Sequence, residues 1–411
     1  MNILFIHANY PAQFKYLCQA FLSDDKNQVV YLTSRRDISD NECFSGLSIH
    51  HFSLHRNPDP NIHHYLSATE STILAGQAVA REIHNLSTSG FVPDLIISHS
   101  GNGLSLFVKD LLPKVKLIGY FEWYFTAGTS RYLFEKFSLD DQLKLGMRNF
   151  SILRELELCD VAVVPTAWQK SQFPPEFSDK LVSIFDGIDN NFFFPLSQAE
   201  TLELKSQDLR LQNRETKEVF LLSPEKKIVS YATRGMEPLR GFPEFMRSLP
   251  SLLSGDSDIN VVIAGADRRA YSYDSPSEGG SWKDYLLEEL KGKIEFERII
   301  FVGLLNYSDY RSLLWRSDLH CYFTRPYVTS WSFFEACACG SRLISNAIPA
   351  TAQISEDESV TWVDLDQSSH SLSRAMLQAL NSPIEIRGKL KEQFYLQNSL
   401  RNWQELINSI I

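Results

Sequence analysis

The chain has 411 residues, of which 44% are hydrophobic and 22% are charged, and its formal net charge is −10 at pH 7. This length and composition are typical of a globular protein with roughly two or three domains. The acidic balance argues against nucleic-acid binding as the main function. No apolar run approaches the ~18 residues that a membrane-spanning helix needs, and the N-terminal MNILFIHANYP lacks the basic region of a signal peptide.

The cysteines are scattered along the chain, and no two of them form a CxxC pair. Cys337 and Cys339 lie two positions apart on a predicted helix, so they face different directions. The pattern predicts reduced, mostly packed thiols, as expected of a cytoplasmic protein.

The first half of the chain alternates short apolar runs with helical stretches. The runs are ILFI (3–6), QVVYLT (28–33), DLIISHS (94–100), VKLIGYF (115–121), DVAVVPT (160–166) and LVSIFDG (181–187). Near-continuous apolar strands separated by helices are typical of a parallel sheet in an α/β domain. The pattern stops at residues 188–226, which are polar and predicted to be irregular.

A second series of apolar runs follows. Its members are KIVSYAT (227–233), INVVIAGAD (259–267), RIIFVGL (298–304), LHCYFT (319–324), SRLIS (341–345) and VTWVDL (360–365). The sequence therefore predicts two doubly wound α/β domains, residues 1–190 and 191–384, and a helical segment, residues 385–411. We expect ligands to bind in a cleft at the carboxyl ends of the strands.

The loop after the first strand of the second domain, RGMEPLRGF, suits a phosphate group. It places Arg234 and Arg240 beside Gly235 and Gly241, just before a helix. Two guanidinium groups and glycine backbone could clamp phosphate oxygens. A solvated surface loop is the alternative, but polar loops also follow two neighbouring strands, which favours a nucleotide site.

The stretch TRPYVTSWSFFEACACGSRLIS (324–345) reads as strand, turn, helix and strand, with a helix from Ser332 to Cys339 that Gly340 ends. The residues around the helix start are Thr329, Ser330, Trp331 and Ser332. Ser332 and Glu335 have the spacing of a capping box. The same helix start could instead bind an anion with its backbone N–H groups.

In the first domain, His99 and Glu122 end neighbouring predicted strands. His99 could act as a general base or bind a hydroxyl group. Glu122 lies among four aromatic residues and could be a carboxylate with a raised pKa. The alternatives are that His99 is only a polar packing residue and that Glu122 forms an ion pair at the end of its strand.

No convincing metal site emerges from the sequence. The histidines at positions 50, 51, 55, 63 and 64 lack metal-ligand spacing and are predicted to lie in a solvated loop. Asp364 and Asp366 form a DLD pair without a further acidic residue nearby, so a structural role is favoured. GxGxxG is absent, which removes the main support for a dinucleotide-dependent oxidoreductase.

Four segments resemble one known family. FDGIDNNFFFP (185–195), FFEACACGSRLISN (333–346), the RGMEPLRG loop and FVGLL (301–305) are similar, in this order, to motifs of the retaining family-4 glycosyltransferases. That family has the GT-B fold, in which two Rossmann-like domains face each other across a cleft. The start, ILFIHANYPAQF, resembles a bacterial branch associated with surface polysaccharide assembly.

The resemblance implies roles for individual residues. Glu335 matches the family glutamate that holds the ribose hydroxyls of the nucleotide, and Arg234 and Arg240 match the basic pair on the diphosphate. Ser330 and Trp331 match the backbone that meets phosphate and donor sugar. Glu122 falls where many members of the family carry a histidine near the donor sugar, and His99 lies one strand earlier, at another common cleft position. We expect four further residues to complete the nucleotide site: Thr329, Ser332, Gly235 and Gly241.

The reaction that the resemblance implies is retaining hexosyl transfer without a metal ion or other cofactor. We expect UDP-glucose as donor, with GDP-mannose as the next choice, and a saccharide or lipid-linked saccharide as acceptor. No nucleic-acid partner is expected; contact with the inner face of the membrane is a further expectation.

Two positions depart from the family pattern. Tyr327 replaces the first of two glutamates, and the first loop, NYPAQF, has no glycine. The alternatives are therefore a catalytically weak sugar-nucleotide-binding protein and a GT-B-fold sugar-nucleotide epimerase. A two-carboxylate glycoside hydrolase built on Glu122 and Glu335 would leave the basic loop without a purpose.

Overall fold

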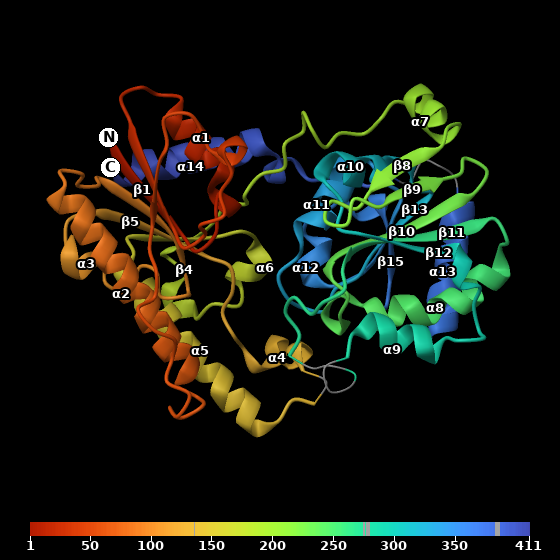
Figure 1. Ribbon diagram of the computed structural model, residues 1–411, viewed down its shortest axis with the longest axis horizontal. Helices are drawn as coiled ribbons and strands as arrows, with labels where there is room; N and C mark the ends of the chain where they lie inside the picture. Colours follow the sequence, from red (N-terminus) through yellow and green to blue (C-terminus); the bar gives the residue numbers. More distant parts are fainter. Residues whose placement is uncertain (135, 274–275, 277–279, 383–386) are drawn as a thin grey trace. The chain divides into compact units, whose positions relative to one another are not determined.

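The computed structural model describes residues 1–134, 136–273, 276, 280–382 and 387–411. The chain forms two compact units, each with its own parallel sheet (Figure 1). Unit 1 consists of Met1–Ser130, Phe137–Gly187 and Leu396–Ile411, and unit 2 consists of Arg131–Lys136 and Ile188–Tyr395. The predicted boundary between residues 384 and 385 lies outside the described residues.

In the described residues of unit 1, the sheet has seven parallel strands in the order β3-β2-β1-β4-β5-β6-β7. The strands are β1 (Asn2–His7), β2 (Gln28–Thr33), β3 (Ser48–His51), β4 (Leu95–Ser100), β5 (Lys116–Phe121), β6 (Val161–Val164) and β7 (Leu181–Ser183). The strand order reverses between β1 and β4, where ligands of such sheets usually bind. The predicted loop is wrong for His50 and His51, which form part of the edge strand β3.

Helices cover both faces of this sheet. They are α1 (Lys15–Leu22), α2 (Ser67–Thr88), α3 (Val108–Leu111), α4 (Ala127–Ser130), α5 (Leu139–Leu158), α6 (Ala167–Lys170) and α14 (Leu396–Ile410), with short 3-10 turns η1 (Ala12–Phe14), η2 (Asp40–Glu42) and η4 (Pro175–Phe177). The C-terminal α14 packs on α1, and its Trp403 and Ile407 are buried in the same cluster as Leu17. The last helix therefore completes the core of unit 1.

In the described residues of unit 2, a six-stranded parallel sheet has the order β12-β11-β10-β13-β14-β15. The strands are β10 (Lys227–Gly235), β11 (Ile259–Ala266), β12 (Ile299–Gly303), β13 (Leu319–Tyr322), β14 (Leu343–Asn346) and β15 (Val360–Val363). The order reverses between β10 and β13, so the loops after these two strands share one edge of the sheet. The α/β, doubly wound prediction is confirmed for both units.

The helices of unit 2 are α7 (Gln198–Lys205), α8 (Phe242–Gly255), α9 (Trp282–Glu289), α10 (Tyr307–Arg316), α11 (Trp331–Ala338), α12 (Pro349–Ala352) and α13 (Ser369–Asn381). Its 3-10 turns are η3 (Arg131–Leu133), η5 (Pro238–Arg240), η6 (Phe296–Arg298), η7 (Asp357–Ser359) and η8 (Glu392–Phe394). The prediction that residues 188–226 are irregular is wrong in part, because α7 and the antiparallel pair β8 (Leu209–Gln212) and β9 (Val219–Leu222) lie there. β9 exposes the apolar side chains of Val219 and Leu221, so it lacks the alternation of apolar and polar residues that marks a half-buried strand.

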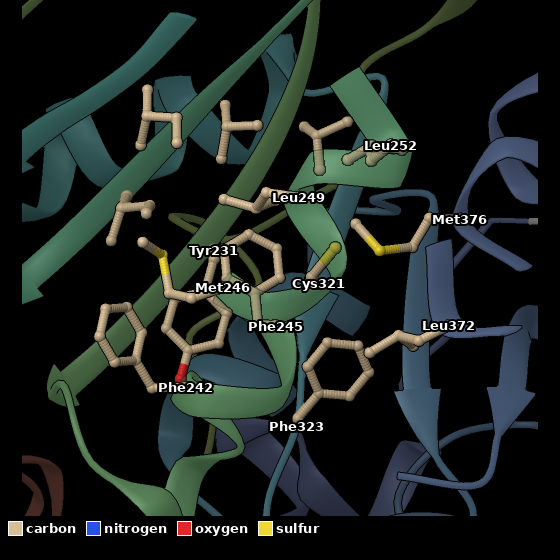
Figure 2. Packing of buried hydrophobic residues seen from close by; sticks show 14 of the residues in the cluster. Tyr231, Phe242, Phe245, Met246, Leu249, Leu252, Cys321, Phe323, Leu372 and Met376 are labelled. Carbon is tan, nitrogen blue, oxygen red and sulfur yellow. The ribbon is translucent and has the colours of Figure 1, made fainter. Parts of the chain in front are cut away.

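The core of unit 2 supports the loop after β10. Tyr231 of β10 stacks on Phe245 of α8 with ring centroids 4.7 Å apart, and Met376 of α13 packs in the same cluster (Figure 2). The hydroxyl group of Tyr231 donates a hydrogen bond to the backbone oxygen of Arg240 (2.7 Å). The buried ring thus fixes the backbone of a predicted site residue.

The chain enters and leaves the main part of unit 2 at neighbouring residues. Ile188 and Tyr395 form a parallel bridge, and the N–H of Ile188 donates to the backbone oxygen of Phe394 (2.9 Å). Among the described residues, no helix is long and apolar enough to cross a lipid bilayer.

Candidate functional site

The arginine loop of unit 2, residues 234–241, depends on its two glycines. A Cβ atom on Gly235 would lie 2.6 Å from the backbone oxygen of Arg268, and one on Gly241 would lie 2.6 Å from the Cβ of Phe323. Gly241 also has a left-handed φ of +64°. Both glycines therefore let the loop pack closely against the loops that follow β11 and β13.

Arg240 is a buried cation with neutral partners. It is 4% exposed, and its Nη1 donates to the hydroxyl of Thr324 (2.8 Å), the backbone oxygen of Val328 (2.9 Å) and the hydroxyl of Tyr322 (3.4 Å). No carboxylate of the described residues lies within 4 Å of it. A buried charge that no carboxylate contacts is costly, so this guanidinium is suited to an anionic ligand.

Arg234 is exposed and reaches the same aromatic side chain as Arg240. Its Nη1 donates to the hydroxyl of Tyr271 (3.3 Å). The Cζ atoms of Arg234 and Arg240 lie 6.0 and 5.2 Å from the centroid of the Tyr271 ring. The structure therefore brings the two predicted arginines together, although one is buried and the other is exposed.

The start of α11 lies beside Arg240 through a shared tyrosine. The hydroxyl of Tyr322, which accepts from Arg240, also accepts the backbone N–H of Ser330 (2.9 Å). Ser330 is the N-cap of the helix, and its side chain accepts the N–H of Ser332 (3.4 Å). Thr329, just before the cap, donates its hydroxyl to the backbone oxygen of Ala350 (2.9 Å).

The predicted capping box between Ser332 and Glu335 is wrong. The helix begins at Trp331 rather than at Ser332, because Ser330 takes the capping position. Glu335 therefore lies inside α11, and it is 5% exposed. The predicted end of the helix is confirmed by Gly340, whose φ of +65° is left-handed.

Glu335 has a strongly perturbed carboxyl group. Burial raises its pKa to about 8, and no cation of the described residues lies within 4 Å. The carboxyl group is then mostly protonated at neutral pH and can both donate and accept hydrogen bonds. Such a group suits a pair of neighbouring hydroxyls.

The DLD pair is engaged in other contacts. Asp366 forms an ion pair with Arg325, which also pairs with Glu244 (2.5 Å each). Asp364 accepts the backbone N–H of Asp366 (2.9 Å). Within the described ranges of the chain, no group of three or more histidine, cysteine, aspartate or glutamate side chains could hold a metal ion.

In unit 1, the predicted residues His99 and Glu122 meet at the strand ends. The Nε2 of His99 lies 3.8 Å from a carboxylate oxygen of Glu122, and Gln13 donates its side-chain amide to the other oxygen (2.5 Å). His7 ends β1, and its Nε2 lies 2.8 Å from Oε1 of Gln13. The four side chains form one polar cluster, which we call the histidine cluster.

His7 was missed by the sequence analysis, although it ends a strand as His99 does. Its ring centroid lies 4.2 Å from that of His99. Burial, followed by the proximity of His99, lowers the pKa of His7 well below its usual value. His7 is therefore neutral at pH 7 and can pass hydrogen bonds through Gln13 to Glu122.

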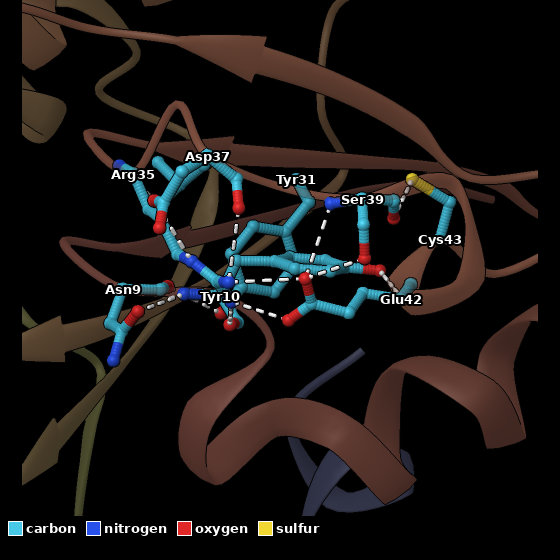
Figure 3. Close-up of polar contacts among 9 residues, drawn as sticks. Asn9, Tyr10, Tyr31, Arg35, Asp37, Ser39, Glu42 and Cys43 are labelled. Atoms are coloured by element: carbon cyan, nitrogen blue, oxygen red, sulfur yellow. Dashed lines mark hydrogen bonds and ion pairs between the residues drawn. The ribbon is translucent and has the colours of Figure 1, made fainter. Parts of the chain in front are cut away.

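An ion pair on the loop after β2 holds the loop that carries Gln13 (Figure 3). Arg35 donates to the backbone oxygen of Tyr10 (2.8 Å) and to the carboxylate of Glu42 (2.7 Å). The hydrogen bond from Arg35 lowers the pKa of Glu42 to about 2. The pair stays ionised over the physiological pH range, so the first loop remains tied down without a glycine.

A second missed residue, Glu155 of α5, holds the loop after His99. It is fully buried, and its carboxylate accepts the backbone N–H groups of Gly101 (2.6 Å), Gly103 (3.1 Å) and Ser105 (2.8 Å). Burial raises its pKa, although these hydrogen bonds act in the opposite direction. Glu155 lies far from the loop in sequence, so no local pattern predicts this contact.

Two protein-family models match the chain. That of the glycosyl transferase family 4 group matches residues 25–193, and that of the glycosyl transferases group 1 matches residues 213–397. The chain belongs to the family-4 glycosyltransferases with the GT-B fold. This confirms the family resemblance of the sequence motifs.

Solved structures share the fold of this glycosyltransferase over the whole chain. HepE from Anabaena, solved in complex with UDP-glucose, is 12% identical with a TM-score of 0.67, and 100% of each chain is covered. Sucrose-phosphate synthase from Thermosynechococcus elongatus is 15% identical with a TM-score of 0.68, covering 100% of this chain and 99% of that one.

A third similar structure is a putative UDP-N-acetylglucosamine 2-epimerase from Listeria monocytogenes. It is 11% identical with a TM-score of 0.57, and the match covers 99% of this chain and 96% of that one. No curated protein matches the glycosyltransferase. At these identities the likeness shows the fold, which transferases and epimerases share.

Proposed function

We propose that this glycosyltransferase moves a sugar, glucose as first candidate, from a nucleoside diphosphate sugar to a saccharide or lipid-linked saccharide in polysaccharide biosynthesis. The observation that carries the proposal is Arg240, a buried guanidinium without a carboxylate partner among the described residues. It lies beside Arg234 and the start of α11, where a diphosphate would be stabilised. HepE, with the same fold, is solved with UDP-glucose, which supports UDP-glucose as the donor to test first.

The chemistry follows from where charge develops. When the bond between the sugar C1 and the β-phosphate oxygen breaks, negative charge grows on the leaving diphosphate. Arg240, Arg234 and the N-terminus of α11 would stabilise that charge. Glu335 would hold the ribose hydroxyls of the nucleotide.

We propose that the reaction retains the anomeric configuration. The acceptor oxygen then forms the new bond to C1 on the face from which the diphosphate leaves, and its proton passes to a β-phosphate oxygen. The histidine cluster of unit 1 would bind acceptor hydroxyls, because Glu122 offers carboxylate oxygens next to the buried Nε2 of His99.

The first test is a calorimetric panel of UDP, GDP and ADP and of their glucose, galactose, N-acetylglucosamine and mannose conjugates. We expect UDP and UDP-glucose to bind most tightly. Absence of binding by every nucleotide would overturn the proposal, and tighter binding of GDP-mannose would replace the donor.

Product analysis separates the alternative functions. Release of UDP that depends on an added saccharide supports a transferase. Conversion of one UDP-sugar to another without an acceptor would indicate an epimerase. Binding without turnover would indicate a sugar-nucleotide-binding protein, the reading that Tyr327 favours because its buried ring replaces the family carboxylate.

Metal independence is a separate prediction. Because two arginines are available to balance the diphosphate, we expect the turnover rate to remain within about twofold of its starting value in excess EDTA. Initial rates with and without EDTA test this, with added Mn²⁺ as the control. Loss of activity in EDTA that Mn²⁺ restores would show that a metal ion takes part.

A further inference from the structure

Tyr271, on the loop after β11, contacts both arginines of the proposed diphosphate site. The centroid of its ring lies 5.2 Å from Cζ of Arg240 and 6.0 Å from Cζ of Arg234, and its hydroxyl accepts from Nη1 of Arg234 (3.3 Å). The ring of Tyr271 also contacts the ring of Tyr327, and the two centroids lie 5.6 Å apart. One neutral ring therefore contacts two positively charged guanidinium groups.

This arrangement keeps the positive charge available. The face of an aromatic ring attracts cations, so it offsets the repulsion between two guanidiniums. A carboxylate in the same place would bind them more strongly but would neutralise them and compete with a phosphate. A tyrosine holds the two arginines together without neutralising them, so their positive charge remains available to bind a phosphate.

The backbone of Tyr271 is fixed by a buried acid. Glu237 is fully buried, and its carboxylate accepts the N–H groups of Ala270 (3.1 Å), Tyr271 (3.0 Å) and Ser272 (2.8 Å). No lysine or arginine of the described residues lies within 4 Å of this carboxylate, so these backbone donors are its partners. Gly235 permits the close approach, because a Cβ there would lie 3.0 Å from the nitrogen of Ala270.

We propose that Tyr271 is a positioning residue for the diphosphate: its ring holds Arg234 and Arg240 as a pair, and Glu237 holds the ring in place through the loop backbone. The inference rests on the proposed function of this site and adds that the site selects a nucleoside diphosphate over a monophosphate. Tyr271 acts on recognition of two linked phosphates rather than on recognition of the nucleoside.

The test compares UDP with UMP in calorimetric titrations of wild type, Tyr271→Leu and Tyr271→Phe. We expect Tyr271→Leu to weaken UDP binding about tenfold and UMP binding by less than about threefold. Tyr271→Phe keeps the ring and should stay within about threefold of wild type for both. Tyr285→Leu is the matched control, because Tyr285 packs its half-exposed ring on Trp282 (5.8 Å) in α9.

Equal losses of UDP and UMP binding in Tyr271→Leu, or an unchanged UDP affinity, would overturn the inference. Wild-type protein that binds neither nucleotide would instead overturn the proposed function, so the two failures are distinguishable. A merely structural role would lower the melting temperature without changing the ratio of the UDP and UMP affinities.

A double-mutant cycle tests the part assigned to Glu237. Glu237→Gln removes the charge from the hydrogen bonds to the loop and should reproduce the selective loss of UDP binding. If Glu237 acts on the arginines only through Tyr271, its replacement has no further effect once the ring is gone. We therefore expect Glu237→Gln/Tyr271→Leu to bind UDP no more weakly than Tyr271→Leu alone. Additive losses would overturn the claim that Glu237 acts through Tyr271, and the single Tyr271 variants test the ring whether or not Glu237→Gln folds.

Discussion

Arg240→Lys is expected to lower kcat by about 10²–10³-fold, the loss typical when a group that stabilises transition-state charge is removed. In the folded protein, one nitrogen of Arg240 is used by Thr324 and Val328, which leaves the rest of the guanidinium for the ligand. A lysine has a single nitrogen and cannot serve both purposes. Initial rates at saturating donor measure kcat, and calorimetry measures the affinity for UDP.

The affinity for UDP should fall less than kcat, because the charge on the diphosphate grows as it leaves. Arg247→Lys is the control, since Arg247 lies on α8 and pairs with Glu289 (2.7 Å). A kcat within about threefold of wild type would contradict the assigned role. Equal losses in kcat and affinity would assign Arg240 to ground-state binding.

Glu335→Gln is expected to change how stability depends on pH. The folded pKa of about 8 lies above the ordinary glutamate value of 4.5, so the folded state holds a proton that the unfolded state releases between these values. The stability associated with the protonated carboxyl is complete below about pH 4.5 and is lost as the pH rises toward 8. The wild-type free energy of unfolding should fall by roughly 2–3 kcal/mol between pH 5 and pH 7, relative to that of Glu335→Gln.

Urea denaturation of both proteins at several pH values, without nucleotide, measures this difference. Glu155→Gln is an informative comparison, because Glu155 is also buried but accepts several hydrogen bonds that favour its charged form. That variant should lose stability at pH 7. Parallel pH curves for wild type and Glu335→Gln would show that Glu335 has an ordinary pKa.

The residues that end strands were the most predictable part of the site. Arg234 and Arg240 in unit 2, and His99 and Glu122 in unit 1, lie at or after the ends of apolar runs, and within each sheet the parallel strands bring their ends to one edge. Apolar runs also identified six strands in each unit, but not β3, whose histidines hide its pattern, nor the short antiparallel pair β8 and β9. The position of Glu335 came from the family motif, and its local pattern suggested the wrong capping role.

The supporting residues could not be predicted, for a common physical reason. Glu155 and Glu237 bind backbone N–H groups of loops, and such groups carry no side-chain signature in the sequence. Tyr271 is recognisable only once Arg234 and Arg240 are known to lie against its ring. These contacts depend on tertiary geometry rather than on spacing along the chain.

The bridge between Ile188 and Tyr395 has a consequence for dissecting the protein. Apart from Arg131–Lys136, unit 2 is an insertion in unit 1, and its two ends are neighbours. A gene fragment that stops after Gly187 would lack α14 and expose the apolar surface that Trp403 covers. Joining Gly187 to Leu396 through a short linker would instead keep all segments of unit 1 in one chain. In the same way, a linker between Tyr395 and Ile188 would close unit 2 and allow new termini to be opened elsewhere in it.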